Sequence, residues 1–316
     1  MKLVTFQKGS RISCGILTDK GIIDIKSFKG ISNPPATVLD ILNRGAGFLE
    51  KLKKLVQKAT RFIPVNSVKL LAPIPRPPKV LALAGNYSEH IKEASIKRGF
   101  KLGLSDSARH NTVPRPFLMP QTVIIGTGEI AWPAFSENID YEIELAVVIG
   151  RPIKCVSPRQ ARGAIAGYTI ANDISARTVT FKQGRNPRPW DEFYDWLNGK
   201  WADGFLPTGP YLLTADEVDD PQALDMELKV NGRIRQKANT SAMIYPVEDI
   251  VSFLSHLMTL EPGDIIATGT PAGVAVATGE FLQPGDFIEC SIEKLGTLAN
   301  TLGPRPKRFY TPLKQP

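Results

Sequence analysis

The hydrophobic pattern of the chain contains an uninterrupted apolar run from Leu145 to Ile149, closed by Gly150. Its β-branched residues and its short length predict a buried strand. Glu142 and Glu144 lie in the stretch that leads into this run. Side chains two residues apart on a strand point to the same face, so these carboxylates are predicted to lie side by side, about 7 Å apart along the strand.

A second strand-like run, from Gly167 to Asp173, also ends in an acid. Two like charges at the edge of an apolar core repel each other and resist desolvation unless a cation compensates them. Two acids in one strand more often mark a strand with one wet face, but Asp173 adds a third carboxylate. Glu142, Glu144 and Asp173 therefore form a candidate site for a hard divalent cation such as Mg²⁺, Mn²⁺ or Ca²⁺.

The remaining pattern predicts a division of the chain into domains. Residues 1–72 alternate short strand patterns with two helical ones, which is typical of a small α/β domain; the strands are expected at 3–6, 13–17 and 21–25, and the helices at 37–43 and 48–59. The proline-rich stretch 73–78 is stiff and extended, as in a linker. Residues 79–303 form the predicted main domain, and residues 304–316 a basic, proline-containing tail.

Strand patterns dominate the main domain, so the fold class is mainly β with α (α+β). The expected elements are strands at 79–84, 211–214, 226–230, 265–268 and 287–292, a hairpin turn at Asn231-Gly232, and helices from Ser88 and over 247–260. The segment 97–116, which contains His110, is polar, basic and irregular. A long irregular segment in a compact domain is often a lid over an active site.

Composition narrows the class of protein. The 316 residues are 42% hydrophobic and 22% charged, as in an ordinary globular protein. The net charge of +8 comes with basic clusters at 51–61 and 305–308, but no aromatic or reading motif accompanies them. We therefore expect solvated basic surfaces and no nucleic-acid partner.

Cysteine usage and the apolar runs indicate the compartment. Cys14, Cys155 and Cys290 are far apart and odd in number, which predicts free thiols in a reducing environment. The amino terminus lacks a signal-peptide pattern, and no run approaches the length of a membrane span. A cytoplasmic enzyme without a membrane partner is expected.

Several motifs together resemble the fumarylacetoacetate hydrolase superfamily, in matching order and spacing over about residues 70–300. They are Gly85-Asn86-Tyr87-x-x-His90-x-x-Glu93, Asp140-Tyr141-Glu142-x-Glu144-Leu145, Gly167-Tyr168-Thr169-x-x-Asn172-Asp173-x-Ser175-Ala176-Arg177, Gly199-Lys200, Gly209-Pro210 and Gly263-Asp264-Ile265-Ile266-x-Thr268-Gly269-Thr270-Pro271-x-Gly273. The resemblance implies a mixed β-sandwich roll, usually a homodimer, with Mg²⁺, Mn²⁺ or Ca²⁺ bound by Glu142, Glu144 and Asp173. It also implies a small 2-oxo or 1,3-dicarbonyl carboxylic acid as substrate.

The resemblance assigns further roles to single residues. It implies a catalytic pair in which Glu93 orients His90, which activates a water. Lys200 matches a lysine that meets the substrate or a developing oxyanion. Tyr87, Arg177 and Thr270 match substrate contacts, although a structural salt bridge is an equally good interpretation of Arg177. His110 is a weaker candidate, and His256, in an amphipathic helical pattern, is interpreted as structural.

Two positions depart from the family pattern. Thr180 stands where many relatives have a substrate-contacting glutamine, and Met119 where many have a lysine. Both changes predict a less polar pocket. The segment 182–201 is also longer and more aromatic than in small relatives. The sequence therefore defines the identity of the substrate less closely than it defines the metal site.

Three functions remain open at this point. The first is a metal-dependent hydrolase that cleaves a C–C bond in an acylpyruvate- or fumarylacetoacetate-like 1,3-diketo acid, with the metal stabilising the enolate. The second is a decarboxylase, isomerase or dehydratase that acts on a related 2-oxo acid, of the oxaloacetate, hydroxymuconate or sugar-acid type. The third is a metal-binding scaffold that has lost catalysis.

Overall fold

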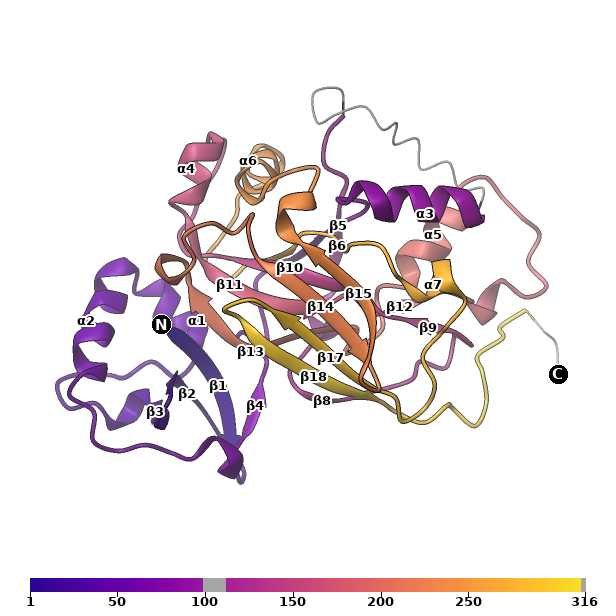
Figure 1. Ribbon diagram of the computed structural model, residues 1–316. Helices are drawn as coiled ribbons and strands as arrows, with labels where there is room; N and C mark the ends of the chain where they lie inside the picture. The colour runs from indigo at the N-terminus through magenta and orange to yellow at the C-terminus, as the bar shows by residue number, and fades with distance from the viewer. Residues whose placement is uncertain (99–111, 314–316) are drawn as a thin grey trace.

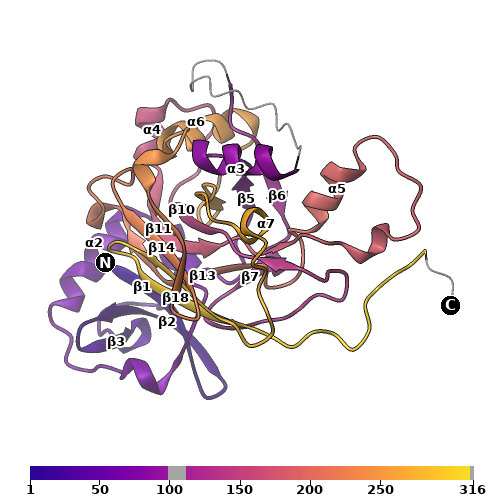
Figure 2. The ribbon, with the colours of Figure 1, turned by 45° about the vertical axis from the view of Figure 1, so that its right-hand side comes forward.

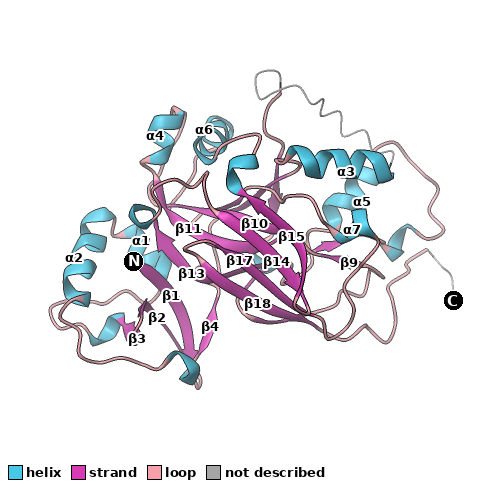
Figure 3. Cartoon of the chain, viewed as in Figure 1, coloured by secondary structure: helices cyan, strands magenta, loops and turns pink. Residues whose placement is uncertain are grey.

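The computed structural model describes residues 1–98 and 112–313. Most strands belong to one large mixed sheet (Figures 1 and 3): β1 Lys2–Lys8, β2 Arg11–Thr18, β3 Gly21–Asp24, β4 Lys69–Leu71, β5 Val80–Leu83, β6 Pro116–Met119, β7 Ile124–Ile125, β10 Ile143–Ile149, β11 Ile165–Asn172, β13 Leu206–Thr214 and β16 Ile265–Ala267. Its order is β3-β2-β1-β13-β11-β10-β16-β5-β6, with β4 beside β1 and β7 beside β13. The pairs β16–β5 and β13–β7 are parallel, and the other pairs are antiparallel.

A second sheet packs against the first. Its strands are β8 Gly128–Ile130, β14 Asp225–Val230, β15 Arg233–Asn239, β17 Phe287–Ile292 and β18 Gly296–Leu302, in the order β15-β14-β17-β18-β8. β17 and β18 lie against β11 and β13 of the large sheet. A short ribbon pairs β9 Ile139–Asp140 with β12 Ser175–Ala176. The predicted mixed β-sandwich is confirmed.

The strand predicted from the uninterrupted apolar run lies at the centre of the core. Every residue of β10 is buried. Successive side chains on a strand point to opposite faces, so Leu145 and Val147 belong to one hydrophobic cluster, whereas Ala146 and Val148 belong to another. Both faces of the large sheet are covered here, which is why the sequence reads as a continuous apolar run and not as an alternation.

Seven α-helices surround the sheets in the described part of the chain: α1 Val38–Asn43, α2 Ala46–Val56, α3 Ser88–Arg98, α4 Pro158–Arg162, α5 Asp191–Asn198, α6 Val247–Leu257 and α7 Ala275–Thr278. Thr37 and Asp40 form a capping box at the start of α1, which explains why the helix begins there. The predicted helices near 37, 48, 88 and 247 are present, although α2 ends at Val56 and not at Ala59.

The turn predicted from Asn231-Gly232 joins β14 to β15, and both residues have positive φ, 50° and 76°. This backbone conformation is the one that favours Asn-Gly in two-residue hairpins. The segment predicted as long and aromatic, 182–201, contains the helix α5, which sequence reasoning did not find. Figure 2 shows α5 and its flanking loops standing out from the rest of the fold.

The amino-terminal strands extend the large sheet. β1 pairs with β13, with Lys2 opposite Leu213, and the Thr5 hydroxyl donates to the carbonyl of Pro73 at 2.7 Å. The sheet therefore continues from residues 1–72 into residues 79–303. The division into domains, linker and tail remains a prediction.

Two further predictions concern the ends and the surface of the fold. Most of the segment predicted as a lid, residues 99–111 with His110, lies outside the described residues. Within the described part, every helix is too short or too polar to cross a bilayer. Near the end of the described residues, Tyr310 donates its N–H to the carbonyl of Ala134 at 2.6 Å.

Candidate active site

Three acids from neighbouring strands form a buried cluster. Glu142 lies between β9 and β10, Glu144 is the second residue of β10, and Asp173 follows β11. Ligand oxygens of the three carboxylates lie within 4.8 Å of one another. The Asp173 N–H donates to the carbonyl of Glu142 at 2.8 Å, and the Glu142 N–H donates to the Asn172 side chain at 2.9 Å. Antiparallel pairing of β10 and β11 therefore brings together the acids that the sequence singled out.

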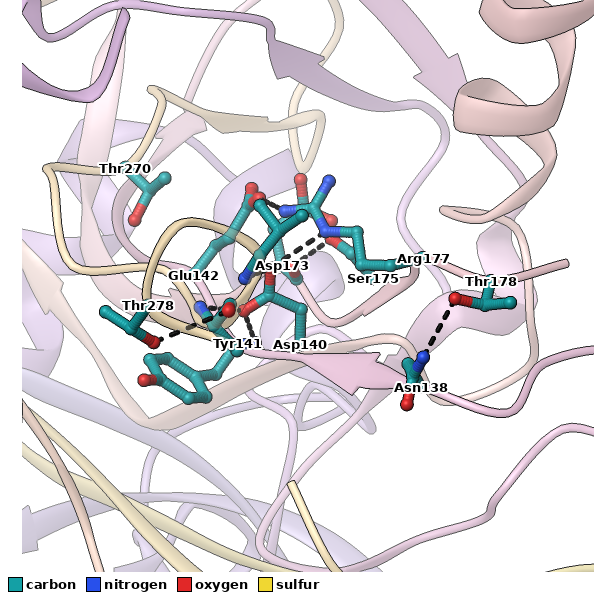
Figure 4. A network of polar contacts seen from close by, with 12 residues as sticks. Asn138, Asp140, Tyr141, Glu142, Asp173, Ser175, Arg177, Thr178, Thr270 and Thr278 are labelled. Atoms are coloured by element: carbon teal, nitrogen blue, oxygen red, sulfur yellow. Dashed lines mark hydrogen bonds and ion pairs between the residues drawn. The ribbon is translucent and has the colours of Figure 1, made fainter. Parts of the chain in front are cut away.

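Two cations balance this negative charge. Lys200 Nζ donates to Glu142 Oε2 at 2.8 Å and to Asp173 Oδ2 at 2.7 Å, and its side chain is buried. Arg177 is paired with Glu142 and, through Nε, with Asp140 Oδ2 at 2.8 Å; Figure 4 shows Arg177 between these acids. The structural salt bridge that the sequence allowed for Arg177 is present.

The cations and the burial act in opposite directions on the carboxyl groups. Burial opposes ionisation of Glu142, but the charges of Lys200 and Arg177 outweigh it and lower its pKa to about 2. Burial raises the pKa of Asp173 to about 6, because Lys200 only partly offsets it and Glu142 adds to it. Burial, together with Asp173 and Glu142, holds the pKa of Glu144 well above its usual range. Burial and mutual repulsion thus oppose ionisation of Asp173 and Glu144, and a divalent cation would favour the ionised forms.

A histidine and an acid from α3 face the same site. His90 Nδ1 lies 3.1 Å from Glu93 Oε1. The backbone N–H of Gly273 donates to both carboxylate oxygens of Glu93, at 3.1 and 3.0 Å. The turn after β16 therefore fixes Glu93, and Glu93 contacts the imidazole of His90; the catalytic role of this pair remains a prediction.

The glycine-rich turn after β16 supplies the other side of the site. The Gly269 N–H donates to Glu144 Oε2 at 2.7 Å, with φ of +95° at Gly269, and a Cβ there would lie 2.7 Å from the Cβ of Asn86. Glycine is needed at this position for both reasons. Thr270 Oγ1 accepts a hydrogen bond from Gln236 Nε2 at 2.8 Å.

A cavity of about 490 Å³ connects these groups. Its lining includes the predicted residues His90, Glu142, Asp173, Arg177, Lys200 and Thr270. The other lining residues are Leu83, Ala84, Gly85, Arg115, Pro116, Phe117, Ala176, Val179, Lys182, Glu192, Phe193, Asp195, Trp196 and Val276. The cavity thus combines a charged floor with a largely apolar wall.

Tyr87 is placed differently from the expectation. It is not among the described residues that line the cavity. Its ring is buried in the core, and its hydroxyl donates to Met226 Sδ of β14 at 3.4 Å. Tyr87 also forms a β-bridge with Met243, which follows β15, and its ring belongs to the hydrophobic core.

The two departures from the family pattern also lie away from the cavity lining. Thr180 is buried and donates to the carbonyl of Tyr310 at 2.5 Å, and Met119, the last residue of β6, packs in the hydrophobic core. Neither is among the described lining residues, so the expectation that they make the pocket less polar is not met through direct contact. Lys182 and Arg115 line the cavity instead.

Sequence reasoning missed several supporting residues. Asp140 is fully buried, accepts N–H groups from Ala275 and Val276, and holds Arg177. Gln236 of β15 accepts the N–H of Ile143 at 3.0 Å and donates to Thr270. Asp140 is the first residue of one of the quoted motifs and could have been found there, whereas nothing around Gln236 in the sequence marks it.

The comparison with family models agrees with this architecture. Residues 79–303 match the model described as fumarylacetoacetate (FAA) hydrolase, C-terminal. The chain belongs to this family. The match takes in the acidic cluster, His90, Lys200 and the glycine-rich turn.

Relatives within the fumarylacetoacetate hydrolase family carry different activities in their names. A Bos taurus protein named oxaloacetate tautomerase FAHD2A, mitochondrial, is 34% identical over 310 residues, which cover 95% of this chain and 91% of that protein. The structure of a 5-carboxymethyl-2-hydroxymuconate delta-isomerase from Mycobacterium smegmatis is 31% identical, with a TM-score of 0.71 over 97% of this chain and 100% of that chain. A maleylpyruvate hydrolase from Sphingobium, in complex with manganese (II) ion and pyruvate, is 29% identical, with a TM-score of 0.74 over the same shares. The family thus processes 2-oxo acids and related compounds by more than one reaction.

Proposed function

We propose that this protein is a divalent-metal-dependent enzyme that moves a proton at the carbon next to the carbonyl of a 2-oxo acid, and so interconverts its keto and enol forms. The observation that carries the proposal is the positioned base: Glu93, held by the N–H of Gly273, orients His90, which lines the same cavity as Glu142 and Asp173 of the acidic cluster. Similarity over nearly the whole chain to proteins named oxaloacetate tautomerases supports the same reaction type.

The acidic cluster fits a divalent metal. Asp173 Oδ1 is buried and has no hydrogen-bond partner among the described residues, and oxygens of Glu142 and Glu144 lie within 4.8 Å of the Asp173 carboxylate. Three carboxylates with an unpartnered oxygen are a suitable donor set for Mg²⁺ or Mn²⁺. When bound, such an ion supplies Lewis-acid stabilisation of negative charge on substrate oxygens. Mg²⁺ is our first choice of metal.

The chain's own residues perform the proton transfer. Because Nδ1 of His90 faces Glu93, Nε2 is the ring nitrogen that can exchange a proton with the substrate. The proton passes from the carbon to Nε2 of His90, and the resulting imidazolium gives a proton to the carbonyl oxygen, which completes the enol and restores neutral His90. Lys200 contributes a buried positive charge beside the site where negative charge develops.

Hydrolysis of a C–C bond in an acylpyruvate, the first choice at the sequence level, is the second candidate. The cavity has room for a substrate longer than a four-carbon acid and for a water molecule, and the similarity to a maleylpyruvate hydrolase supports this reaction. In this case His90 takes a proton from the water, the water oxygen adds to the distal carbonyl, and the C–C bond breaks to release an enolate that is then protonated.

The deciding experiment follows both reactions in one sample. Protein with Mg²⁺ is mixed in D₂O with oxaloacetate, pyruvate or an acylpyruvate, and NMR records deuterium exchange at the carbon next to the carbonyl and the release of two carbon fragments. Exchange without cleavage supports the tautomerase, and cleavage supports the hydrolase. His90→Ala should lower either rate at least about 100-fold.

His256→Ala is the matched control. His256 lies on α6, where its Nδ1 is 2.9 Å from the carbonyl of Ser252, and it is not among the described lining residues. Its replacement should leave the rate within about twofold. Unchanged turnover in His90→Ala with intact metal binding would refute both proposed reactions.

The metal site has its own test. Thermal unfolding is measured with and without Mg²⁺ or Mn²⁺ for the wild type, Asp173→Asn and Glu192→Gln. A metal at about 100 times its Kd stabilises the wild type by roughly 2.7 kcal/mol. Glu192 lines the same cavity outside the acidic cluster, so Glu192→Gln should keep this stabilisation, whereas Asp173→Asn should lose most of it. If metal stabilised Asp173→Asn and Glu192→Gln equally, the metal would bind outside the acidic cluster.

The homodimer and the cytoplasmic location are also part of the proposal. The family resemblance supports the dimer, and light scattering on the purified protein tests it. The three free cysteines support a reducing compartment. Several similar proteins carry the word mitochondrial in their names, and fractionation of the source cells distinguishes the two compartments.

A further inference from the structure

Three aromatic side chains form one wall of the cavity. Phe117 comes from β6, and Phe193 and Trp196 come from α5. The rings of Phe117 and Trp196 meet edge to face with centroids 4.9 Å apart, and the rings of Phe193 and Trp196 are 5.9 Å apart. All three residues line the cavity, and we call them the aromatic wall. Phe193 remains 43% exposed, so the wall offers apolar ring surface that the protein itself does not cover.

The wall is held rigidly. Arg185 donates to both carboxylate oxygens of Asp195 at 2.8 Å, which fixes α5 to the loop before it. Trp201 Nε1 donates to the carbonyl of Leu118 at 3.1 Å, which ties the chain after α5 to β6. A preformed apolar surface loses little conformational entropy when a ligand covers it.

The wall is joined directly to the reactive end of the cavity. The helix α5 ends at Asn198, two residues before Lys200, and Ala176 donates its N–H to the carbonyl of Gly199 at 2.9 Å. Lys200 in turn bonds to Glu142 and Asp173. A 2-oxo acid bound at the acidic cluster would therefore direct its far end toward the aromatic wall.

The size of the cavity indicates a substrate with a substantial far end. Pockets of about 300–1,000 Å³ bind ligands of drug-like size. A four-carbon acid would leave much of this cavity of about 490 Å³ unfilled and the aromatic wall uncovered.

The charged residues near the aromatic wall do not select strongly for a substrate that carries a second carboxylate at its far end. Arg115 and Lys182 line the cavity, but so do Glu192 and Asp195. Asp195 is neutralised by Arg185, and Glu192 offsets one of the two cations, so a single positive charge is left near the wall. A neutral far end is compatible with this mixture, and stacking on aromatic rings favours a flat one.

We propose that the substrate is a 2-oxo acid with a flat apolar substituent, such as a phenyl ring, which packs on the aromatic wall. This inference rests on the proposed function, because it takes the acidic cluster as the site of the 2-oxo acid group. It names Phe193 and Trp196 as specificity-determining residues.

The test measures binding and turnover separately. Calorimetry with Mg²⁺ present compares phenylpyruvate, pyruvate and 2-oxoglutarate, and deuterium exchange by NMR compares their turnover. The wild type should bind phenylpyruvate at least about tenfold more tightly than the other two acids. Phe193→Ala should lower the affinity for phenylpyruvate about tenfold and change that for pyruvate less than about twofold.

Two further variants sharpen the test. Trp190→Ala is the matched control, since Trp190 lies in the same segment, is 76% exposed and is not among the described lining residues; it should change nothing. Phe193→Leu keeps apolar volume without a flat ring and should fall between the wild type and Phe193→Ala.

The outcomes separate the two proposals. Equal affinity for phenylpyruvate and pyruvate, tighter binding of 2-oxoglutarate, or equal losses for all acids in Phe193→Ala would overturn the inference about the substrate. Absence of exchange with every acid, together with a selective loss of phenylpyruvate binding in Phe193→Ala, would overturn the proposed reaction and support the aromatic wall as the binding surface.

Discussion

The backbone N–H of Gly273 donates to both carboxylate oxygens of Glu93, although the two residues are 180 positions apart in the chain. Gly273 belongs to the turn after β16, and Glu93 to α3. Because Glu93 also holds His90, one backbone N–H in the turn sets the orientation of the proposed base. The acidic cluster contacts the same turn, because the N–H of Gly269 donates a hydrogen bond to Glu144.

Replacement of the orienting carboxylate should reduce turnover without unfolding the protein. Glu93→Gln keeps the shape and an acceptor oxygen for Gly273, but it removes the negative charge beside His90. We expect kcat to fall about 10- to 100-fold with an unchanged melting temperature. Glu89→Gln on the same helix removes an exposed acid that pairs with Lys92 and should leave kcat unaffected. A similar loss in both variants would argue against a special role for Glu93.

The close approach at Gly273 should make this glycine hard to replace. Its φ is +104°, and a Cβ would lie 2.2 Å from the carbonyl oxygen of Arg235. Gly273→Ala should cost about 3 kcal/mol or more in the free energy of unfolding, from backbone strain and overlap together. Gly279 also has a positive φ, +81°, but no neighbour within 4 Å, so Gly279→Ala should cost only about 1–2 kcal/mol. Urea unfolding of the two variants measures the difference, and equal costs would contradict the structure.

Removal of the buried lysine should make the stability of the protein depend more strongly on metal than it does in the wild type. Lys200→Met leaves Glu142 and Asp173 buried without their ammonium partner. In the presence of a chelator we expect a loss of about 3 kcal/mol or more in the free energy of unfolding, and saturating Mg²⁺ should restore part of it. Lys182→Met, at the exposed lysine of the same cavity, should change stability by less than about 0.5 kcal/mol. A loss that Mg²⁺ does not reduce would show that the metal and Lys200 do not share these carboxylates.

The three thiols should differ sharply in reactivity. Cys155 is exposed, whereas Cys14 and Cys290 are buried. Burial, with the charges of Asp24 and Asp40, raises the pKa of Cys14 to about 12. At pH 8 a thiol reagent should therefore modify one cysteine in the folded protein and three in denaturant.

The pKa of Cys14 also sets a direction for alkaline stability. Its folded value exceeds the usual value of 9.0, so the protonated thiol favours the folded state. Any stability from this group is fully present below pH 9 and is lost as the pH rises toward 12. The free energy of unfolding of Cys14→Ala should decrease less than that of the wild type as the pH rises above 9. Unfolding of both proteins at pH 8, 9 and 10 measures the difference. Rapid labelling of Cys14 at pH 8 would contradict the packing of β2, and rapid labelling of Cys290 would contradict the packing of β17.

The sequence by itself determined the features that depend on residues close together in the chain. The apolar run before Gly150 predicted β10, and the two-residue spacing of Glu142 and Glu144 placed both acids at its start. The Asn-Gly pair predicted the hairpin between β14 and β15. These patterns predict structure correctly because the geometry of a strand or a turn is set by a few neighbouring residues.

The tertiary structure decided which distant residues meet. It placed Lys200 between Glu142 and Asp173, turned Tyr87 into the core, and brought Gln236 to Thr270. It also assembled the aromatic wall from β6 and α5, which no local pattern indicated. Such contacts follow from how the two sheets and the helices pack, and packing depends on the whole set of buried side chains and not on the residues next to each one in the chain.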